Sequence, residues 1–238
     1  MKLKPYILLI LVMTFINCKE DKPLTLYVGT YTDTDSEGIY KMQFNTNSGR
    51  ITNVEVAAKI ASPSYLAISP NKEKLYAVQE SNDFENGAGA VTAFTLENDS
   101  LIEIQTVSSG GAHPCHLSLS PAGDKLGVAN YSGGNANVYD IAADGKLSEP
   151  GIVMNHTTID SAKTAHAHMI QWLNDDIYVA DLGLDALLEY RDQPSNNAKA
   201  KATIQLPKGV GPRHFTSTQN GRFLYVINEL NSTIAVFE

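Results

Sequence analysis

A strand-turn-strand pattern recurs four times along the chain, and it limits the possible folds more than any other feature of the sequence. Each copy has a short apolar strand, a turn containing Pro, Asn, Asp or Gly, and a second apolar strand. The copies begin at Pro63, Pro114, His166 and Pro212, at spacings of 51, 52 and 46 residues. Units of about 40–50 residues that alternate strands with tight turns are typical of β-propeller blades. The repeat therefore predicts an all-β fold, a β-propeller of four-stranded antiparallel blades.

The same pattern predicts which residues form the propeller. We expect the outer strands of one blade at 24–60, four-stranded blades at about 63–106, 114–153 and 166–206, and three strands of a fifth blade after 212. With 43% hydrophobic and 18% charged residues, the chain has the composition of a globular protein. Residues 24–238 are predicted to be one propeller domain, because blades bury their apolar faces only against one another.

Polar residues occupy equivalent positions in the repeats. The first strand of each propeller blade lines the central channel, so equivalent positions on successive blades converge on the axis. One set lies in the first strand and the other at the end of the second strand. These residues are Tyr65, His116, His168 and His214, and then Gln79, Glu80, Asn130, Tyr131, Asp181, Asn228 and Glu229. Packing does not require polar groups there, so the sequence predicts a site at the axis; a set of structural histidines and carboxylates is the alternative.

Several motifs resemble the lactonase family of seven-bladed propellers, which includes bacterial 6-phosphogluconolactonase and is related to the fungal carboxy-muconate lactonizing enzyme. The resemblance runs from about residue 24 to the end. Its motifs are Leu-Tyr-Val-Gly-Thr-Tyr (26–31), His-Pro-Cys-His-Leu (113–117), Val-Ala-Asn-Tyr-Ser-Gly-Gly (128–134), Ala-His-Ala-His (165–168), Tyr-Val-Ala-Asp-Leu-Gly (178–183), Gly-Pro-Arg-His (211–214) and Asn-Glu-Leu-Asn (228–231). It implies a cofactor-free hydrolase of carbohydrate metabolism that opens a sugar-acid lactone by water attack at the axis.

The resemblance also implies a catalytic set. The active site proposed for that family contains a His, an Arg, a Glu and a later second Arg, all facing the channel. Arg213 and Glu229 match the first Arg and the Glu, and His168 matches the His, with His166 as the competing assignment. The second Arg belongs to a later blade. About five of the expected seven blades are present, so we expect a fragment of a longer protein whose incomplete ring exposes apolar faces and a strand edge.

The residue chemistry indicates individual roles. His168 or Glu229 is the expected general base, and Arg213 would hold an anionic group or the developing oxyanion. His214 follows Arg213 on a strand and should point the opposite way, in a supporting role. The expected substrate-binding residues are His166, Asp181, His214, Asn228 and His116.

Metal and thiol chemistry are not expected. His166 and His168 would share a strand face, but no third ligand is fixed by spacing, so no metal is predicted. We interpret Cys115 as a small buried residue at the start of a strand rather than as a catalytic thiol.

The N-terminal segment resembles a lipoprotein signal peptide at 1–17. Lys2 and Lys4 precede a mainly apolar run at 7–16, which is too short to span a bilayer. Cys18 follows and would become the lipidated N-terminus, with 18–23 as a short linker. This predicts an exported lipoprotein of the cell envelope, attached to the membrane only through the lipid. Plain secretion and a noncleaved anchor are the alternatives, and a cytoplasmic location follows if the signal is not one.

Charge narrows the partners. The net charge is −8, and no Lys/Arg cluster is present, which excludes a nucleic-acid partner. No protein partner is indicated, and the resemblance implies a small sugar-acid lactone as the partner. An unphosphorylated lactone suits the envelope better than a phosphorylated one. Two alternatives stay open: a lactonizing enzyme of the muconate cycloisomerase type, and a non-enzymatic envelope propeller that serves as a binding scaffold.

Overall fold

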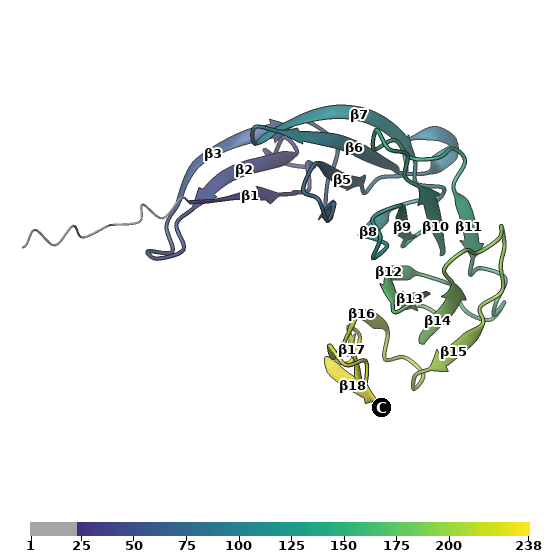
Figure 1. The fold of residues 1–238 in the computed structure, drawn as a ribbon. Helices are drawn as coiled ribbons and strands as arrows, with labels where there is room; N and C mark the ends of the chain where they lie inside the picture. Colours follow the sequence, from purple (N-terminus) through teal and green to yellow (C-terminus); the bar gives the residue numbers. More distant parts are fainter. Residues whose placement is uncertain (1–22) are drawn as a thin grey trace, which may run out of the picture.

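The computed structural model describes residues 23–238, which form five antiparallel sheets placed one after another in an arc (Figure 1). The predicted signal peptide, Cys18 and most of the linker lie outside the described residues. The all-β propeller blades predicted from the repeat are confirmed. Among residues 23–238, no helix has the length and apolar character needed to cross a membrane.

Each sheet is a meander in which consecutive strands are neighbours, and its bounds lie within a few residues of the prediction. The first sheet contains β1 (Leu24–Val28), β2 (Ile39–Phe44) and β3 (Ile51–Ala58). The second contains β4 (Leu66–Ile68), β5 (Lys74–Gln79), β6 (Ala90–Glu97) and β7 (Ser100–Ser108), with a short 3-10 helix, η1 (Glu85–Gly87), before β6. The third contains β8 (Pro114–Leu119), β9 (Lys125–Asn130), β10 (Asn135–Asp140) and β11 (Ile152–Asn155). The fourth contains β12 (Ala167–Leu173), β13 (Asp176–Asp181), β14 (Ala186–Arg191) and β15 (Ala202–Gln205). The fifth contains β16 (Pro212–Ser217), β17 (Leu224–Asn228) and β18 (Thr233–Phe237).

The first strands of successive blades lie side by side on the concave side of the arc (Figure 1). Strand β12 contacts β8 on one side and β16 on the other, and β4 contacts β8. The apolar core lies between the sheets, where Ile170 and Trp172 of the fourth blade pack with Val138 and Met154 of the third. This packing fixes the first strands relative to one another and so positions the residues on the axis.

The first strands of three blades carry a β-bulge at the same place. The pairing register shifts between Pro114 and His116, between Ala167 and Met169, and between Pro212 and His214. The extra residues are Cys115, His168 and Arg213. A bulge leaves one residue unpaired and re-aims side chains, and bulges are frequent beside active sites. The bulges therefore interrupt the strand alternation where the sequence places its polar residues.

The pairing corrects the alignment of the repeats. Pro114 pairs with Asn130, Pro212 with Asn228, and Ala167, rather than His166, with Asp181. His168 is therefore equivalent to Cys115 and Arg213, whereas the sequence alignment placed it with His116 and His214. The error is one residue, and it arose because the third repeat has Ala where the other repeats have Pro.

Candidate active site

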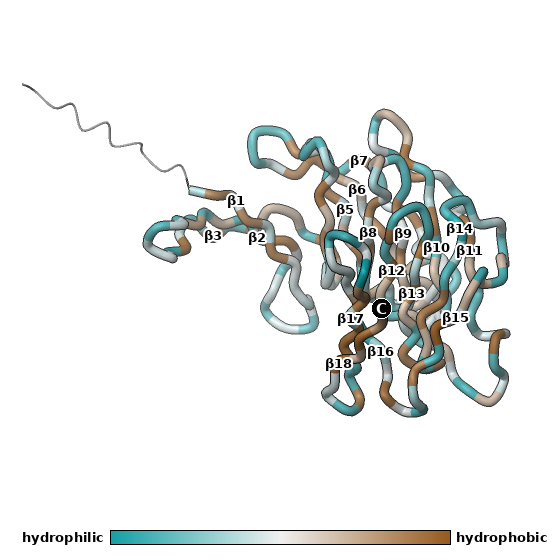
Figure 2. Tube along the Cα trace, turned by 60° about the horizontal axis from the view of Figure 1, so that its bottom comes forward, coloured by the Kyte–Doolittle hydropathy of each residue, from teal (hydrophilic) through white to brown (hydrophobic). Residues whose placement is uncertain are grey.

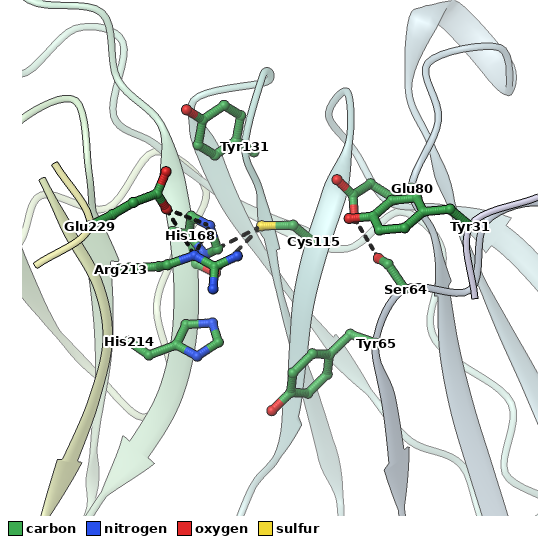
Figure 3. A pocket seen from close by; sticks show the side chains of 10 residues that line it. All are labelled: Tyr31, Ser64, Tyr65, Glu80, Cys115, Tyr131, His168, Arg213, His214 and Glu229. Atoms are coloured by element: carbon green, nitrogen blue, oxygen red, sulfur yellow. Dashed lines mark hydrogen bonds and ion pairs between the residues drawn. The ribbon is translucent and has the colours of Figure 1, made fainter. Parts of the chain in front are cut away.

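A pocket of about 380 Å³ lies on the concave side of the arc, where all five sheets contribute side chains (Figure 3). Its walls are polar and aromatic. The lining residues are Tyr31, Ser64, Tyr65, Glu80, Cys115, Tyr131, His168, Arg213, His214 and Glu229. Cys115, His168 and Arg213 are the extra residues of the three bulges, and Ser64 is the equivalent residue of the second blade. Glu80, Tyr131 and Glu229 each directly follow the second strand of their blade.

Arg213 forms the centre of one wall. Its Nε lies 2.9 Å from Oε2 of Glu229 and donates a hydrogen bond of 3.0 Å to Nε2 of His168. Glu229 and His168 are themselves 3.9 Å apart between Oε2 and Nε2. The side chains of Arg213 and Glu229 are about half exposed (47% and 46%), whereas that of His168 is 8% exposed. The three residues expected to be catalytic thus meet, with the Arg–Glu pair open to the pocket.

His214 lines the same pocket as Arg213, so the expectation that it would point the opposite way is wrong. The bulge is the reason. Arg213 is the extra residue of the bulge, and the register shift between Pro212 and His214 removes the alternation on which that expectation was based.

The pocket histidines are kept neutral. Burial, and then the positive charge of Arg213, lower the pKa of His168 to about 4. The same two causes lower the pKa of His214, against a smaller opposite effect of Glu229. Behind them, burial and then the neighbouring His214 and His168 lower the pKa of His116 to about 3. At neutral pH, Arg213 is therefore the one cation among the described residues that line this pocket.

A second carboxylate, that of Glu80, lies across the pocket from Arg213 (Figure 3). Its Oε2 accepts hydrogen bonds from the hydroxyl of Ser64 and, at 3.0 Å, from the hydroxyl of Tyr31. Ser64 precedes β4, and Tyr31 follows β1, so two blades hold this carboxylate in place.

Two of the expected substrate-binding residues are buried behind the pocket. The carboxylate of Asp181 is fully buried; it lies 2.8 Å from Nδ1 of His156 and accepts hydrogen bonds from the backbone N–H groups of His166 and Leu184. The ring of His116 is 2% exposed and lies 4.2 Å from the ring of Tyr65 between centroids. Both residues fit the alternative interpretation, that some of these histidines and carboxylates are structural, because they are buried and do not line the pocket.

Two more of the five, His166 and Asn228, also lie outside the pocket lining, whereas His214 lines it. His166 precedes β12, donates a 3.0 Å hydrogen bond from Nδ1 to the carbonyl oxygen of Tyr131, and stacks on the Tyr131 ring at 4.4 Å. Asn228 is 3% exposed and donates to the hydroxyl of Thr233. Between the two competing assignments, the geometry brings His168, and not His166, to Arg213.

Ser64 and Tyr31 were not predicted at the site. Glu80 and Tyr131 follow their second strands as Glu229 does, and the repeat placed them at the axis without giving either a role. Ser64 could be identified only from the position of the bulges, which the sequence does not reveal. Tyr31 lies on a loop outside the repeat.

The Cys115 thiol is poorly suited to act as a nucleophile at this site. Cys115 reaches the pocket, but burial raises its pKa to about 12, so the thiol is protonated and weakly nucleophilic at neutral pH. Within the described part of the chain, no three His, Cys, Asp or Glu side chains gather as a metal site would require.

The comparisons with known proteins agree with this geometry. Residues 25–238 match the family model described as "Lactonase, 7-bladed beta-propeller". A 6-phosphogluconolactonase of Bacillus subtilis is 29% identical and covers 89% of this chain, and one of Formosa agariphila is 31% identical, also over 89%. The solved structure of a periplasmic gluconolactonase of Pseudomonas aeruginosa superimposes with a TM-score of 0.79 at 31% identity over 90% of this chain.

The chain spans less than two thirds of the length of these relatives: 61% and 63% of the two sequences and 63% of the solved structure. The match nevertheless includes every described blade. The chain therefore belongs to the lactonase family of seven-bladed β-propellers.

Proposed function

We propose that the protein is a hydrolase that opens a sugar-acid lactone by attack of water in the axial pocket. The observation that carries the proposal is the contact of Arg213 with both Glu229 and His168 in an open, polar pocket. The names of the relatives, two 6-phosphogluconolactonases and a periplasmic gluconolactonase, support the same reaction class.

Arg213 is the proposed electrophilic residue. Its Nε is occupied by Glu229 and His168, whereas its two Nη groups donate to no side chain or carbonyl among residues 23–238. A guanidinium held through Nε presents its remaining donors in a fixed direction. These donors can bind the lactone carbonyl oxygen and stabilise the negative charge that develops on it when water attacks.

Glu229 is the proposed general base. Both His168 and Glu229 can act as a general base, but Nε2 of His168 already accepts the Arg213 hydrogen bond. Glu229 is half exposed, and none of residues 23–238 donates to its Oε1. That oxygen can accept a proton from an attacking water, while His168 orients the guanidinium.

We also propose an exported location with an N-terminal lipid on Cys18. The supporting observations are the apolar run at 7–16 that precedes Cys18 and the periplasmic relative from Pseudomonas aeruginosa. Metabolic labelling with a fatty-acid analogue tests the lipid, with Cys18→Ser as the matched control that should lose both the label and the membrane fraction.

The test of the function is hydrolysis of a panel of sugar-acid lactones, phosphorylated and unphosphorylated, corrected for spontaneous opening. Arg213→Ala should lower kcat by about 10²–10³, the usual effect of removing one oxyanion donor. Arg222→Ala is the matched control, since Arg222 pairs with Glu238 away from the pocket. If a folded protein shows no turnover above background across the panel, the hydrolase proposal is wrong and the binding scaffold becomes the better interpretation.

A further inference from the structure

Glu80 is a pocket carboxylate to which neither the proposed reaction nor the resemblance assigns a role. It follows β5 and is half-buried at the pocket wall opposite Arg213 and Glu229 (Figure 3). Ser64 and Tyr31 donate to the same oxygen, Oε2. Two donors on one oxygen fix the plane of the carboxylate, and such fixed groups are what precise recognition requires.

The second oxygen of Glu80 faces no donor of the described chain. No group among residues 23–238 donates a hydrogen bond to Oε1, although an ionised carboxylate can accept about four in total. The ring of Tyr31, whose hydroxyl donates to Glu80, lies at the same end of the pocket, and Tyr65 also lines the pocket (Figure 3). This end therefore offers an oriented acceptor beside apolar ring faces, an arrangement suited to a ligand that carries hydroxyl donors on a carbon skeleton.

The fixed carboxylate of Glu80 opposes an anionic group placed beside it at this end of the pocket. Among the described residues that line the pocket, Glu80 and Glu229 are carboxylates and Arg213, which pairs with Glu229 at 2.9 Å, is the cation. His168 and His214 are uncharged at neutral pH, because burial and Arg213 lower their pKa values.

We propose that Glu80 is a specificity-determining residue that binds the hydroxyl groups of an uncharged sugar lactone and rejects the phosphorylated form. The inference rests on the proposed function and names its substrate class. Hydroxyl groups of the sugar donate to Oε1, while a phosphate at the same place meets a fixed negative charge. Tyr31 and Ser64 are positioning residues that act through Glu80.

The test compares the protein with its Glu80→Gln variant on a six-carbon sugar-acid lactone and on the 6-phosphate of that lactone. Glu85→Gln is the matched control, because Glu85 is an exposed glutamate in the loop that follows Glu80. Glu80→Gln should raise KM for the unphosphorylated lactone about tenfold, as expected for loss of a charged hydrogen bond, with kcat changed by less than about twofold. KM for the 6-phosphate should stay equal or fall, so the preference for the unphosphorylated lactone should decrease by at least about tenfold.

A binding measurement separates this inference from the proposed function. Calorimetric titration with the corresponding sugar lactam, which is not hydrolysed, should give a Kd about tenfold weaker for Glu80→Gln than for the parent and for Glu85→Gln. Absence of turnover with any lactone would contradict the proposed hydrolase function, but the comparison of lactam affinities would still test the role of Glu80. Equal lactam affinity in the parent and Glu80→Gln, or an unchanged preference between the two lactones, would overturn the role of Glu80.

Discussion

Glu229 is the proposed general base, and His168 is proposed to orient the guanidinium of Arg213. Substituting each residue separates these two roles. Glu229→Gln should lower kcat by about 10²–10⁴, since a general base is lost. His168→Gln should lower kcat only about tenfold, because the glutamine can still accept the Arg213 hydrogen bond. The acid limb of the pH–rate profile should be the same in His168→Gln as in the parent.

The pH profile is the readout that distinguishes the two roles. If His168→Gln removes the acid limb, or if Glu229→Gln keeps more than about a tenth of the parental kcat, then His168 is the base and the assignment made here is wrong.

His116 should make the protein acid-sensitive. Its pKa is about 3 in the folded state and near 6.5 in the unfolded state, so the unfolded chain binds the extra proton as pH falls. The contribution of His116 is fully present above about pH 6.5 and is lost progressively toward pH 3, by about 2 kcal/mol between pH 7 and pH 5. Denaturant unfolding at both pH values should show a smaller difference in His116→Gln than in the parent; an unchanged difference would contradict this.

The three central residues could be predicted, but their arrangement could not. Arg213 and Glu229 are polar residues at repeat positions that face the axis, and the motif match identified them. The bulge at Arg213 depends on how β16 pairs with β17, so local residue pattern does not reveal that His214 shares the pocket. Asp181 has the same sequence signal as the pocket residues, yet its carboxylate is buried against His156.

At the scale of elements, the blades were predictable because local residues specify them. Turn residues and apolar strands recur at a nearly constant spacing, and the observed strands agree within a few residues. The alignment of the fourth sheet failed by one residue because Ala167 replaces the proline that marks the other first strands. The positions of the strands follow from the local pattern of turn and apolar residues, whereas the pairing register of the strands follows from contacts between distant residues.

Gly183 allows the turn after β13 to lie close to the segment before β12 in the fourth blade. It lies in the turn between β13 and β14, and a Cβ there would come within 1.7 Å of the carbonyl oxygen of Thr164, just before β12. Gly183→Ala must therefore displace backbone, and we expect a loss of about 1–3 kcal/mol in the free energy of unfolding. Urea denaturation measures it; a loss below about 0.5 kcal/mol would contradict this close packing.

At the scale of the whole molecule, the described residues form an arc (Figure 1), and hydrophobic residues recur along the strands of both end sheets (Figure 2). The exposed side chains include Leu24, Val28, Ile51 and Val54 in the first sheet and Tyr225, Ile227, Ile234 and Val236 in the fifth. Such patches promote association. The described residues thus show exposed apolar side chains on both end sheets, as expected for an incomplete ring of blades.

Charge on the exposed face of the last sheet should reduce association. Ile234 is 64% exposed and pairs with Ile227 across β17 and β18. Ile234→Lys should lower binding of an apolar dye and light scattering by concentrated protein. Equal dye binding and equal scattering in the variant would show that this face does not drive association.

The most direct test of the central claim, water attack on a lactone at Arg213, is hydrolysis in ¹⁸O-labelled water at enzyme concentrations that make spontaneous opening negligible. The account predicts one ¹⁸O atom in the carboxylate of the product, formed at a rate that Arg213→Ala lowers by about 10²–10³. An unlabelled product would indicate ring opening by elimination, as in a lactonizing enzyme, and an equal rate in Arg213→Ala would place the reaction elsewhere; either result would contradict the account.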